Sequence, residues 1–262
     1  MKKEEIKNLL IKKGYNVEER KVDKNGIEKD CFTIYKGERP KMCPNIYPDE
    51  FIEETEETIM EFIEGISSKC PNIDNLLDKI QNKEYIYDHV ISCIRKCSNN
   101  DEIVKFRVYG DLEEYFRLKL SDEATITLTY QFIEQADIND IHELRFRARR
   151  NSEKTTEIIP MSDILEMFKE DNPYRKGSMF VARCNNGVNG ASAMLQAEKL
   201  NELAEKCEVD ELTILPSSIH EVIIWTGPID DEDEANKMIN DINDNVVEDI
   251  EILSDHVYKY FY

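Results

Sequence analysis

The sequence lacks most of the patterns by which a function is recognised. No apolar run approaches the length of a membrane span, which argues against transmembrane helices. The chain also has no lysine-containing phosphate loop, no four-ligand zinc pattern and no glycine-built turn around a nucleophilic serine. These absences give no support to a P-loop nucleotide-binding protein, a structural zinc protein or a serine hydrolase of the common type.

Basic residues are scarce relative to acidic ones. The 262 residues include 34 Lys and Arg against 55 Asp and Glu, which gives a net charge of -21. A surface that binds nucleic acid or an anionic membrane needs clustered Lys and Arg, so neither is expected as a direct partner. The charge favours a basic protein partner, or a protein that normally holds nucleic acid. The alternative is that the charge only keeps an abundant cytoplasmic protein in solution.

The cysteine pattern predicts a reducing environment. The cysteines are odd in number and widely scattered, at positions 31, 43, 70, 93, 97, 184 and 207. The first residues, Met1 to Ile6, lead into an amphipathic helix, and we expect no signal peptide there. Reduced thiols and a cytoplasmic location are therefore expected.

The first two thirds of the sequence predict an α+β region with many helices. Asn25-Gly26 tolerates the positive φ angles of a tight turn, so residues 15–22 and 27–35 are predicted to form a hairpin. Proline and acidic residues at 47–50 predict the start of a helix that is rich in glutamate between residues 53 and 64. Apolar periodicity predicts helices near 73–80, 85–97, 138–150 and 161–169, and strands near 103–108, 113–120 and 124–132.

The last third predicts a β-α-β-β-α-β order. The expected strands are 179–183, 211–215, 219–226 and 250–260, and the expected helices are 191–207 and 232–245. This order is that of the ferredoxin-like, split βαβ arrangement, in which two helices cover one face of an antiparallel sheet. Pro173 and Gly177 bracket a predicted linker. We therefore expect a helix-rich N-terminal half with β-hairpins in residues 1–172 and a C-terminal module in residues 178–262, as two domains or one continuous domain.

Several segments together resemble one family. They are Pro216–Ile224, Leu253–Tyr258, the loop Asn186–Ser192, Asp111-Leu112, Gln131–Asp137, Arg149–Ser152 and Asn45–Tyr47. The chain resembles an uncharacterised domain-of-unknown-function family of anaerobic gut bacteria and their mobile elements. The resemblance covers most of the chain, although Glu113 and Glu114 are more acidic than the family's pattern. It implies no activity, no cofactor and no catalytic residue.

Ser218, His220 and Glu221 are the candidate catalytic residues. A hydroxyl becomes a nucleophile when a base such as imidazole lies within hydrogen-bond reach. Ser218 and His220 can share one face of a strand, whereas Glu221 points to the other face. The alternative is that Pro216, Ser217 and Ser218 form a hairpin corner and that a neighbour holds His220 as a buried polar residue.

The loop before the predicted helix at 191–207 is the candidate ligand site. Asn186, Gly187, Asn189 and Gly190 follow a strand and precede a helix, where free backbone amides and the helix dipole can hold a small anion. The same residue types also occur in ordinary turns. In a split βαβ sheet we expect this loop and the corner at 216–218 to lie at opposite ends, which disfavours one active site built from both.

Two further clusters have structural and functional interpretations. His89, Cys93 and Cys97 are spaced by four and would share one helical face, but no fourth metal ligand is nearby, so core packing is favoured and no metal is expected. The cluster from Arg145 to Arg150 could hold phosphate. In so acidic a chain it is expected to pair with the glutamate-rich helix at 53–64 or with a second copy, so a homo-oligomer is a further possibility.

The densest acidic segment is the candidate partner-binding site. It begins with five consecutive acidic residues, Asp230, Asp231, Glu232, Asp233 and Glu234. Fixed carboxylates can imitate a phosphate track and occupy a groove that normally holds nucleic acid, although acidic runs are also common on solvated faces. The sequence therefore predicts a non-enzymatic acidic interaction protein, accessory to a mobile element, with no cofactor. The version with a nucleic-acid mimic would inhibit a nucleic-acid-handling or defence protein. The alternative is a hydrolase or small-ligand-binding protein centred on Ser218 and His220.

Overall fold

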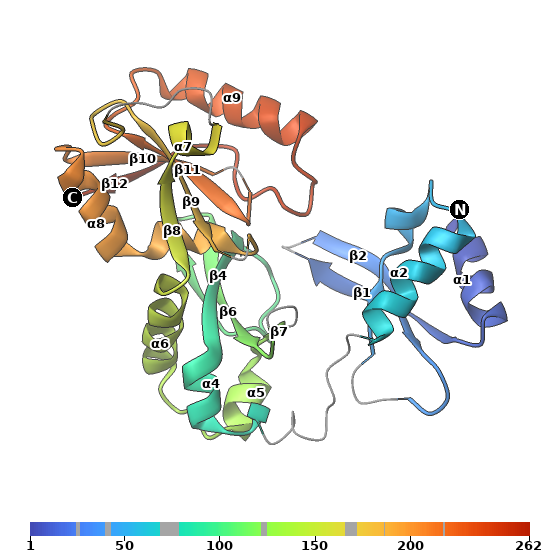
Figure 1. Cartoon of the computed structure of the whole chain (residues 1–262). Helices are drawn as coiled ribbons and strands as arrows, with labels where there is room; N and C mark the ends of the chain where they lie inside the picture. The colour runs from blue at the N-terminus through green and yellow to red at the C-terminus, as the bar shows by residue number, and fades with distance from the viewer. Residues whose placement is uncertain are drawn as a thin grey trace. The chain divides into compact units, whose positions relative to one another are not determined.

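Internal contacts divide the chain into two units, Met1–Asp78 and Lys79–Tyr262 (Figure 1). The structure, a computed structural model, describes residues 1–24, 27–39, 43–68, 79–121, 125–165, 172–185, 187–216 and 218–262. Helices and antiparallel sheets occur in both units, which confirms a mixed α+β fold. The predicted turn at Asn25-Gly26 and most of the predicted helix at 73–80 lie outside the described residues.

The first unit is built on a three-stranded antiparallel sheet in the order β1-β2-β3. Its elements are α1 (Lys3–Lys12), β1 (Asn16–Lys24), β2 (Ile27–Tyr35), β3 (Asn45–Ile46), the 3-10 helix η1 (Pro48–Phe51) and α2 (Glu56–Ser68). Ile6, Phe32 and Ile59 are fully buried and join α1, β2 and α2 in one hydrophobic core.

The second unit contains two antiparallel sheets. The smaller sheet has the order β4-β6-β5 with β7 paired to β6, and comprises β4 (Val90–Lys96), β5 (Lys105–Val108), β6 (Leu112–Lys119) and β7 (Thr125–Thr127). The larger sheet has the order β12-β10-β11-β9-β8, and comprises β8 (Thr156–Pro160), β9 (Met179–Cys184), β10 (Glu211–Pro216), β11 (Glu221–Thr226) and β12 (Tyr258–Phe261). The helices are α4 (Lys83–His89), α5 (Tyr130–Gln135), α6 (Ile141–Glu153), α7 (Met161–Leu165), the 3-10 helix η3 (Gly190–Leu195), α8 (Ala197–Lys206) and α9 (Glu232–Asn245).

The prediction of a helix-rich N-terminal half is not confirmed, because sheets occur along the whole chain. The largest difference is at residues 85–97, where α4 ends at His89 and β4 follows at once. β4 is rich in β-branched residues and pairs along its length with β6, so sheet pairing outweighs the helical spacing of its cysteines. The boundary expected at 172–178 lies inside the second unit, where β8 and β9 pair across it.

The larger sheet has the predicted element order from β9 to β12 but a different layering. β9 and β10 both pair antiparallel with β11, so they are parallel to each other. α8 packs on the sheet face that contains Ile214 and Val222, whereas Leu215 and Trp225, on the opposite face, border a cavity with α9. The expectation that both helices cover one face is therefore wrong. The connections β9–α8–β10 and β11–α9–β12 both run toward the β12 edge of the sheet, but β9 and β11 point in opposite directions. Two crossover connections of the same hand therefore place α8 and α9 on opposite faces.

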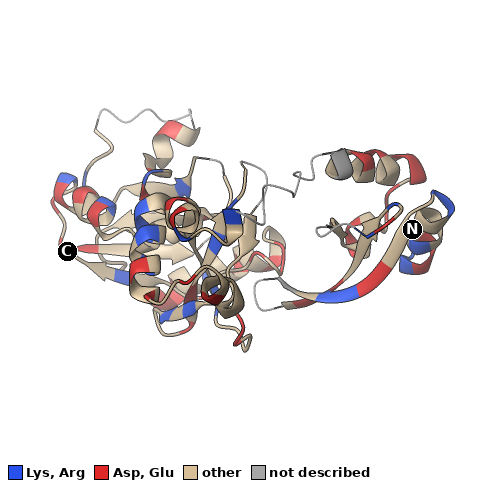
Figure 2. Cartoon of the chain, turned by 90° about the horizontal axis from the view of Figure 1, so that it is seen from below, with Lys and Arg blue, Asp and Glu red and all other residues tan. Residues whose placement is uncertain are grey.

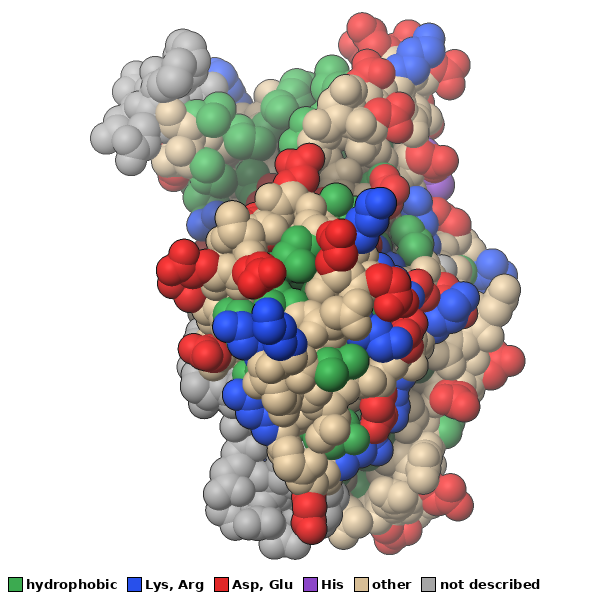
Figure 3. Space-filling view, turned by 90° about the vertical axis from the view of Figure 1, so that its right-hand side faces the viewer, with side chains coloured by type: hydrophobic (Ala, Val, Ile, Leu, Met, Phe, Trp, Pro, Cys, Tyr) green, Lys and Arg blue, Asp and Glu red, His purple; other side chains and the backbone are tan. Residues whose placement is uncertain are grey.

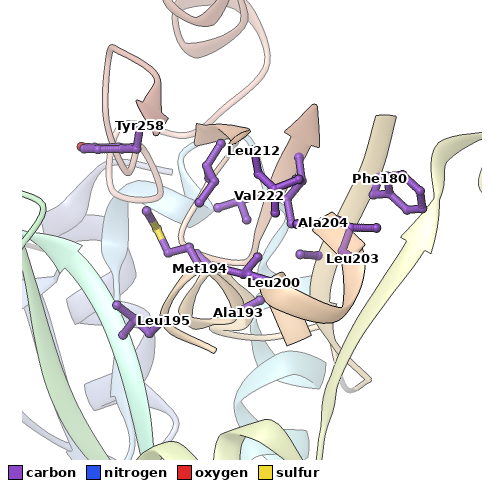
Figure 4. Close-up of a cluster of buried hydrophobic side chains, with 14 of the residues drawn as sticks. Phe180, Ala193, Met194, Leu195, Leu200, Leu203, Ala204, Leu212, Val222 and Tyr258 are labelled. Atoms are coloured by element: carbon purple, nitrogen blue, oxygen red, sulfur yellow. The ribbon is translucent and has the colours of Figure 1, made fainter. Parts of the chain in front are cut away.

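The main core of the second unit lies between α8 and the larger sheet (Figure 4). Leu200 and Leu203 of α8 pack with Phe180, Leu212 and Val222 of the strands. Every second side chain of each strand points into this core, and the side chains between them lie on the opposite face of the sheet. That opposite face carries the candidate site.

Acidic residues are distributed over both units rather than confined to residues 230–255 (Figure 2). Among the described residues, no helix is both long and apolar enough to cross a membrane.

Candidate functional site

An apolar cavity of about 360 Å³ lies between the start of α9 and the sheet face opposite the main core. Its apolar wall comes from three neighbouring strands, the segment between β11 and α9, and α9 itself: Met179, Leu215, Trp225, Pro228, Ile229, Ala235 and Met238. Trp225 of β11 stands directly opposite Met179 of β9 in the strand register, so the two side chains are cross-strand neighbours on one face. The geometry suits an apolar group that needs shelter from water.

Carboxylates border this cavity on one side. Asp230, Asp231 and Glu234 line it, and all three are exposed. The Asp231 carboxylate also caps α9, because it accepts a hydrogen bond from the Glu234 N–H at 3.0 Å. The positive end of the helix dipole stabilises acidic residues at this end, so the carboxylates can be concentrated here at little cost to the fold.

The structure divides the five predicted partner-binding residues. Asp230, Asp231 and Glu234 line the cavity, whereas Glu232 forms an ion pair with Lys259 and Asp233 is exposed outside the lining. Hydrophobic side chains gather at the top of the view in Figure 3, at the end of the second unit where Figure 1 places α7 and α9. Acidic side chains border them.

His220 and the loop before η3 meet at the same end of the sheet, contrary to the expectation that they lie at opposite ends. The Asn189 backbone N–H donates to His220 Nδ1 at 3.3 Å. Because β9 and β10 are parallel, the loop after β9 and the corner after β10 lie at the same end of the sheet. On the other side of the ring, His220 Nε2 and a Glu251 carboxylate oxygen are 3.1 Å apart.

This arrangement leaves the His220 ring no free nitrogen for base catalysis. Nδ1 accepts a hydrogen bond from a backbone N–H, so Nε2 carries the ring proton and donates a hydrogen bond to the Glu251 carboxylate. The Ser218 hydroxyl is buried and accepts a hydrogen bond from the backbone N–H of His220 rather than from the ring. Glu221 is the first residue of β11, on the opposite face from Val222. The geometry supports the structural interpretation of the corner; Ser217 lies outside the described residues.

Replacing His220 by Ala is expected to lower the free energy of unfolding by about 1–3 kcal/mol. The substitution leaves the Asn189 N–H and the Glu251 carboxylate without their partner at a partly buried site. Urea unfolding of the variant measures the loss. An unchanged stability together with loss of an enzymatic activity would instead support catalysis at Ser218 and His220.

The predicted ligand loop uses part of its backbone within the protein. The Gly187 N–H donates to the Cys184 carbonyl at 2.9 Å, and Asn189 donates to His220. Asn189 has a φ of 56°, in the left-handed region where Asn is among the more tolerated residues. Gly190 packs against the carbonyl of His220 so closely that a Cβ would clash. The loop is thus a close-packed turn; Asn186 lies outside the described residues.

His89, Cys93 and Cys97 do not share a helical face. His89 ends α4, Cys93 is fully buried in β4, and Cys97 is exposed after that strand. Burial raises the pKa of the Cys93 thiol to about 12, so it behaves as a small apolar side chain. In the described part of the chain, no three His, Cys, Asp or Glu side chains gather in a way that could hold a metal ion.

Three arginines of the cluster, Arg145, Arg147 and Arg149, form ion pairs within their own unit. Arg145 and Arg149 of α6 both bind the carboxylate of Glu114, which is fully buried in β6, at 2.7 Å. Arg147 pairs with Glu143 on the surface of the same helix. The sequence predicted pairing with the helix at 53–64 or with a second copy, but the carboxylate that Arg145 and Arg149 contact comes from the neighbouring sheet.

A second polar cluster was missed because its members are far apart in the sequence. The Tyr258 hydroxyl lies 2.9 Å from both carboxylate oxygens of Asp111 and 2.7 Å from the Ser254 hydroxyl. Burial raises the pKa of Tyr258 well above its usual range, so the hydroxyl stays protonated and donates. Ser254 also lies 3.2 Å from His256 Nδ1 but is almost fully buried, which prevents attack on a substrate. The cluster joins Asp111-Leu112 and Leu253–Tyr258, two of the segments that carry the family resemblance.

The fold is mixed α+β, and the candidate site is an apolar cavity bordered by carboxylates. A family model described as a family of unknown function, DUF5688, matches residues 2–261, so the chain belongs to that family. This match confirms the predicted membership of a family of unknown function. No curated protein and no solved structure matches the chain.

Proposed function

We propose that this protein is a non-enzymatic interaction protein that binds a protein partner at the cavity between α9 and the larger sheet. The observation that carries the proposal is an apolar cavity with a one-sided carboxylate rim. Asp230, Asp231 and Glu234 supply that rim, and no basic residue is among the described residues that line the cavity. An apolar partner side chain would enter beside Trp225 while a neighbouring Lys or Arg pairs with the rim.

The cavity distinguishes this proposal from a merely solvated acidic face. A solvated face needs only charge, whereas here three strands and a helix bring an indole and two methionine side chains, Met179 and Met238, beside the acids. Aromatic and methionine side chains are enriched in interface cores, and a polar rim around them is the usual arrangement. Met238 is 56% exposed and Met179 is 39% exposed, so contact area is available to a partner.

The chain carries its own reporter for this site. Trp225 is the only tryptophan in the sequence and lines the cavity, so a shift in its fluorescence reports occupancy. Selection from a random peptide library is expected to enrich sequences with an aliphatic or aromatic residue next to Lys or Arg. The selected peptides should change the fluorescence of Trp225, and their affinity should fall as salt rises.

A pair of charge-matched variants tests the rim. Changing Asp230→Asn with Glu234→Gln is expected to weaken the selected peptides about tenfold, because two charge pairs of up to about 1 kcal/mol each are lost. Asp241→Asn with Asp244→Asn removes the same charge from exposed positions of α9 outside the lining, and should leave affinity within about twofold. Equal losses from both variants, or selected peptides without basic residues, would contradict the proposal.

A nucleic-acid mimic is the charge-only version of the same function. The association with mobile elements that the resemblance implies would place its partner among nucleic-acid-handling or defence proteins. Mimicry depends on carboxylate positions and not on the apolar wall. Trp225→Ala should therefore leave the affinity for such a partner unchanged if the carboxylates alone bind. If the cavity binds, the same change should lower affinity at least as much as the rim variant does.

A further inference from the structure

A second cavity adjoins the proposed binding site on the same face of the larger sheet. It has a volume of about 270 Å³, and its apolar lining includes Met161 and Leu165 of α7 and Pro173. Trp225 and Met179 line both cavities, so these two side chains form a shared wall between two compartments. One compartment is bordered by α7 and the other by α9.

Both compartments offer exposed apolar surface. Leu165 is 53% exposed in the compartment at α7, and Met238 is 56% exposed in the compartment at α9. Three methionines from α7, β9 and α9 line the two compartments: Met161, Met179 and Met238. A methionine side chain is unbranched and adapts its shape to the side chains that pack on it. Figure 3 shows hydrophobic side chains gathered at this end of the second unit, so the surface suits a row of apolar side chains.

The strands beneath the two compartments have no free backbone edge. Met179, Leu215 and Trp225 belong to β9, β10 and β11, and each of these strands pairs with a neighbouring strand on both sides. An extended partner segment on this face would meet side chains but no backbone groups with which to pair. Its own N–H and C=O groups would lie unpaired over an apolar surface, which costs free energy. A helix satisfies these groups internally, so a helix suits this face better.

Charge distinguishes the two compartments. The compartment at α7 has no charged residue among the described residues that line it. The compartment at α9 has three carboxylates, from Asp230, Asp231 and Glu234. The complementary partner segment therefore has an apolar face that is flanked by basic residues on one side only.

We propose that the two compartments together bind an amphipathic helix of the protein partner. Side chains three or four positions apart in a helix lie on one face, with their Cβ atoms about 5–6 Å apart. Two such apolar side chains enter the compartments on either side of Trp225 and Met179, while Lys or Arg on one flank of the helix pairs with the carboxylate rim. The inference rests on the proposed function and specifies the partner segment as a basic amphipathic helix.

Two peptides of equal composition test the helical geometry on the unaltered protein. Both are about 16 residues long and mostly alanine, which is long enough for a helix, and both contain three leucines that are each followed by a lysine. In the helical peptide the leucines are spaced four and then three residues apart, which places them on one face of a helix. In the alternating peptide they are two residues apart, which places them on one face of an extended chain.

Titration monitored by Trp225 fluorescence is expected to give at least about fivefold tighter binding for the helical peptide. Only that peptide can place leucines in both compartments and keep its own backbone hydrogen-bonded. Equal affinities, or tighter binding of the alternating peptide, would overturn the helical geometry.

Leu165→Ser tests the compartment at α7, with Ile164→Ser as the matched control. Both side chains are exposed apolar groups of α7, but only Leu165 lines the compartment. Leu165→Ser is expected to bind the helical peptide about fivefold more weakly, because apolar contact with one leucine is lost, whereas Ile164→Ser should stay within about twofold of wild type. The urea midpoints of both variants should remain close to that of wild type, because neither side chain is buried. Equal effects of the two variants on affinity would overturn the inference.

The rim variant separates failure of this inference from failure of the proposed function. If Asp230→Asn with Glu234→Gln weakens the helical peptide while Leu165→Ser does not, the compartment at α9 binds alone, which overturns this inference and supports the proposed function. If neither variant changes the affinity, both fail, whereas loss of affinity in both variants supports both. A dimer of the peptide-free protein in sedimentation equilibrium that Leu165→Ser dissociates would assign the compartments to a second copy of the chain and overturn the helix of a partner protein.

Discussion

Glu114→Gln is expected to lower the free energy of unfolding of the second unit by about 3 kcal/mol or more. The wild-type carboxylate is fully buried and binds Arg145 and Arg149, so the change leaves two arginines beside a neutral amide. Removing one partner from a buried ion pair typically costs about 3–5 kcal/mol. The lower end applies here because both arginines are partly exposed and can turn toward water.

Urea unfolding followed by the fluorescence of Trp225 measures this change in the second unit alone, because the first unit has no tryptophan. Glu143→Gln is the matched control on α6. It breaks an exposed pair with Arg147 and should cost under about 1 kcal/mol. Similar losses from the two variants would mean that the burial of Glu114 contributes nothing.

The pH dependence of the same pair has a defined sign. Burial alone would raise the pKa of the Glu114 carboxyl, but hydrogen bonds and charge from Arg149, with the charge of Arg145, outweigh it and hold the pKa below its usual value. The stabilisation is therefore complete above the ordinary Glu pKa of about 4.3 and is lost as pH falls through the lower pKa of the folded state. The difference in unfolding free energy between wild type and Glu114→Gln should shrink over that acidic range.

Gly190→Ala is expected to destabilise the second unit by about 3 kcal/mol or to prevent its folding. The added Cβ would lie closer than 3.0 Å to three backbone atoms, which belong to Arg183, Cys184 and His220. Backbone atoms cannot turn aside as a side-chain end can, so the strand edge would have to separate. The expected result is a large fall in urea midpoint for this one methyl group.

Gly187→Ala, three residues earlier in the same loop, separates sterics from backbone conformation. Its Cβ would meet no atom within 4 Å, but its φ of +71° disfavours alanine by about 1 kcal/mol. A loss at Gly190 no larger than the loss at Gly187 would contradict the close approach of the loop to His220. A larger loss at Gly190 supports the contact between the loop and the corner.

The sequence predicted local structure well where the neighbouring residues alone decide it. The helix expected at 232–245 has those bounds, because an acidic N-terminus and the spacing of Ala235 and Ile239 suffice to define an amphipathic helix. The prediction of a helix at 85–97 was wrong because the spacing of four residues between His89, Cys93 and Cys97 coincides with a helical period. Pairing with β6, which is separated in sequence, determines the strand instead.

The candidate site shows the same limit. The carboxylates at 230–234 are adjacent in the sequence and were predicted as a partner-binding group. Their apolar counterpart is not adjacent, since Met179, Leu215 and Trp225 lie on three strands and reach one cavity only after the sheet is assembled. No short motif encodes that cavity. The single tryptophan was the one sequence signal of this cavity, and it can be interpreted only when the face of the sheet on which Trp225 lies is known.

The contact between Asp111 and Tyr258 also has a consequence for the order of events during synthesis. The two residues are 147 positions apart, and Tyr258 begins β12, which forms an edge of the larger sheet by pairing with β10. The second unit therefore cannot complete its packing until β12 has left the ribosome, whereas the residues of the first unit are synthesised much earlier. During that interval the β10 edge and the main core are open, so nascent chains stalled before β12 should be the species most prone to aggregate and most dependent on chaperones.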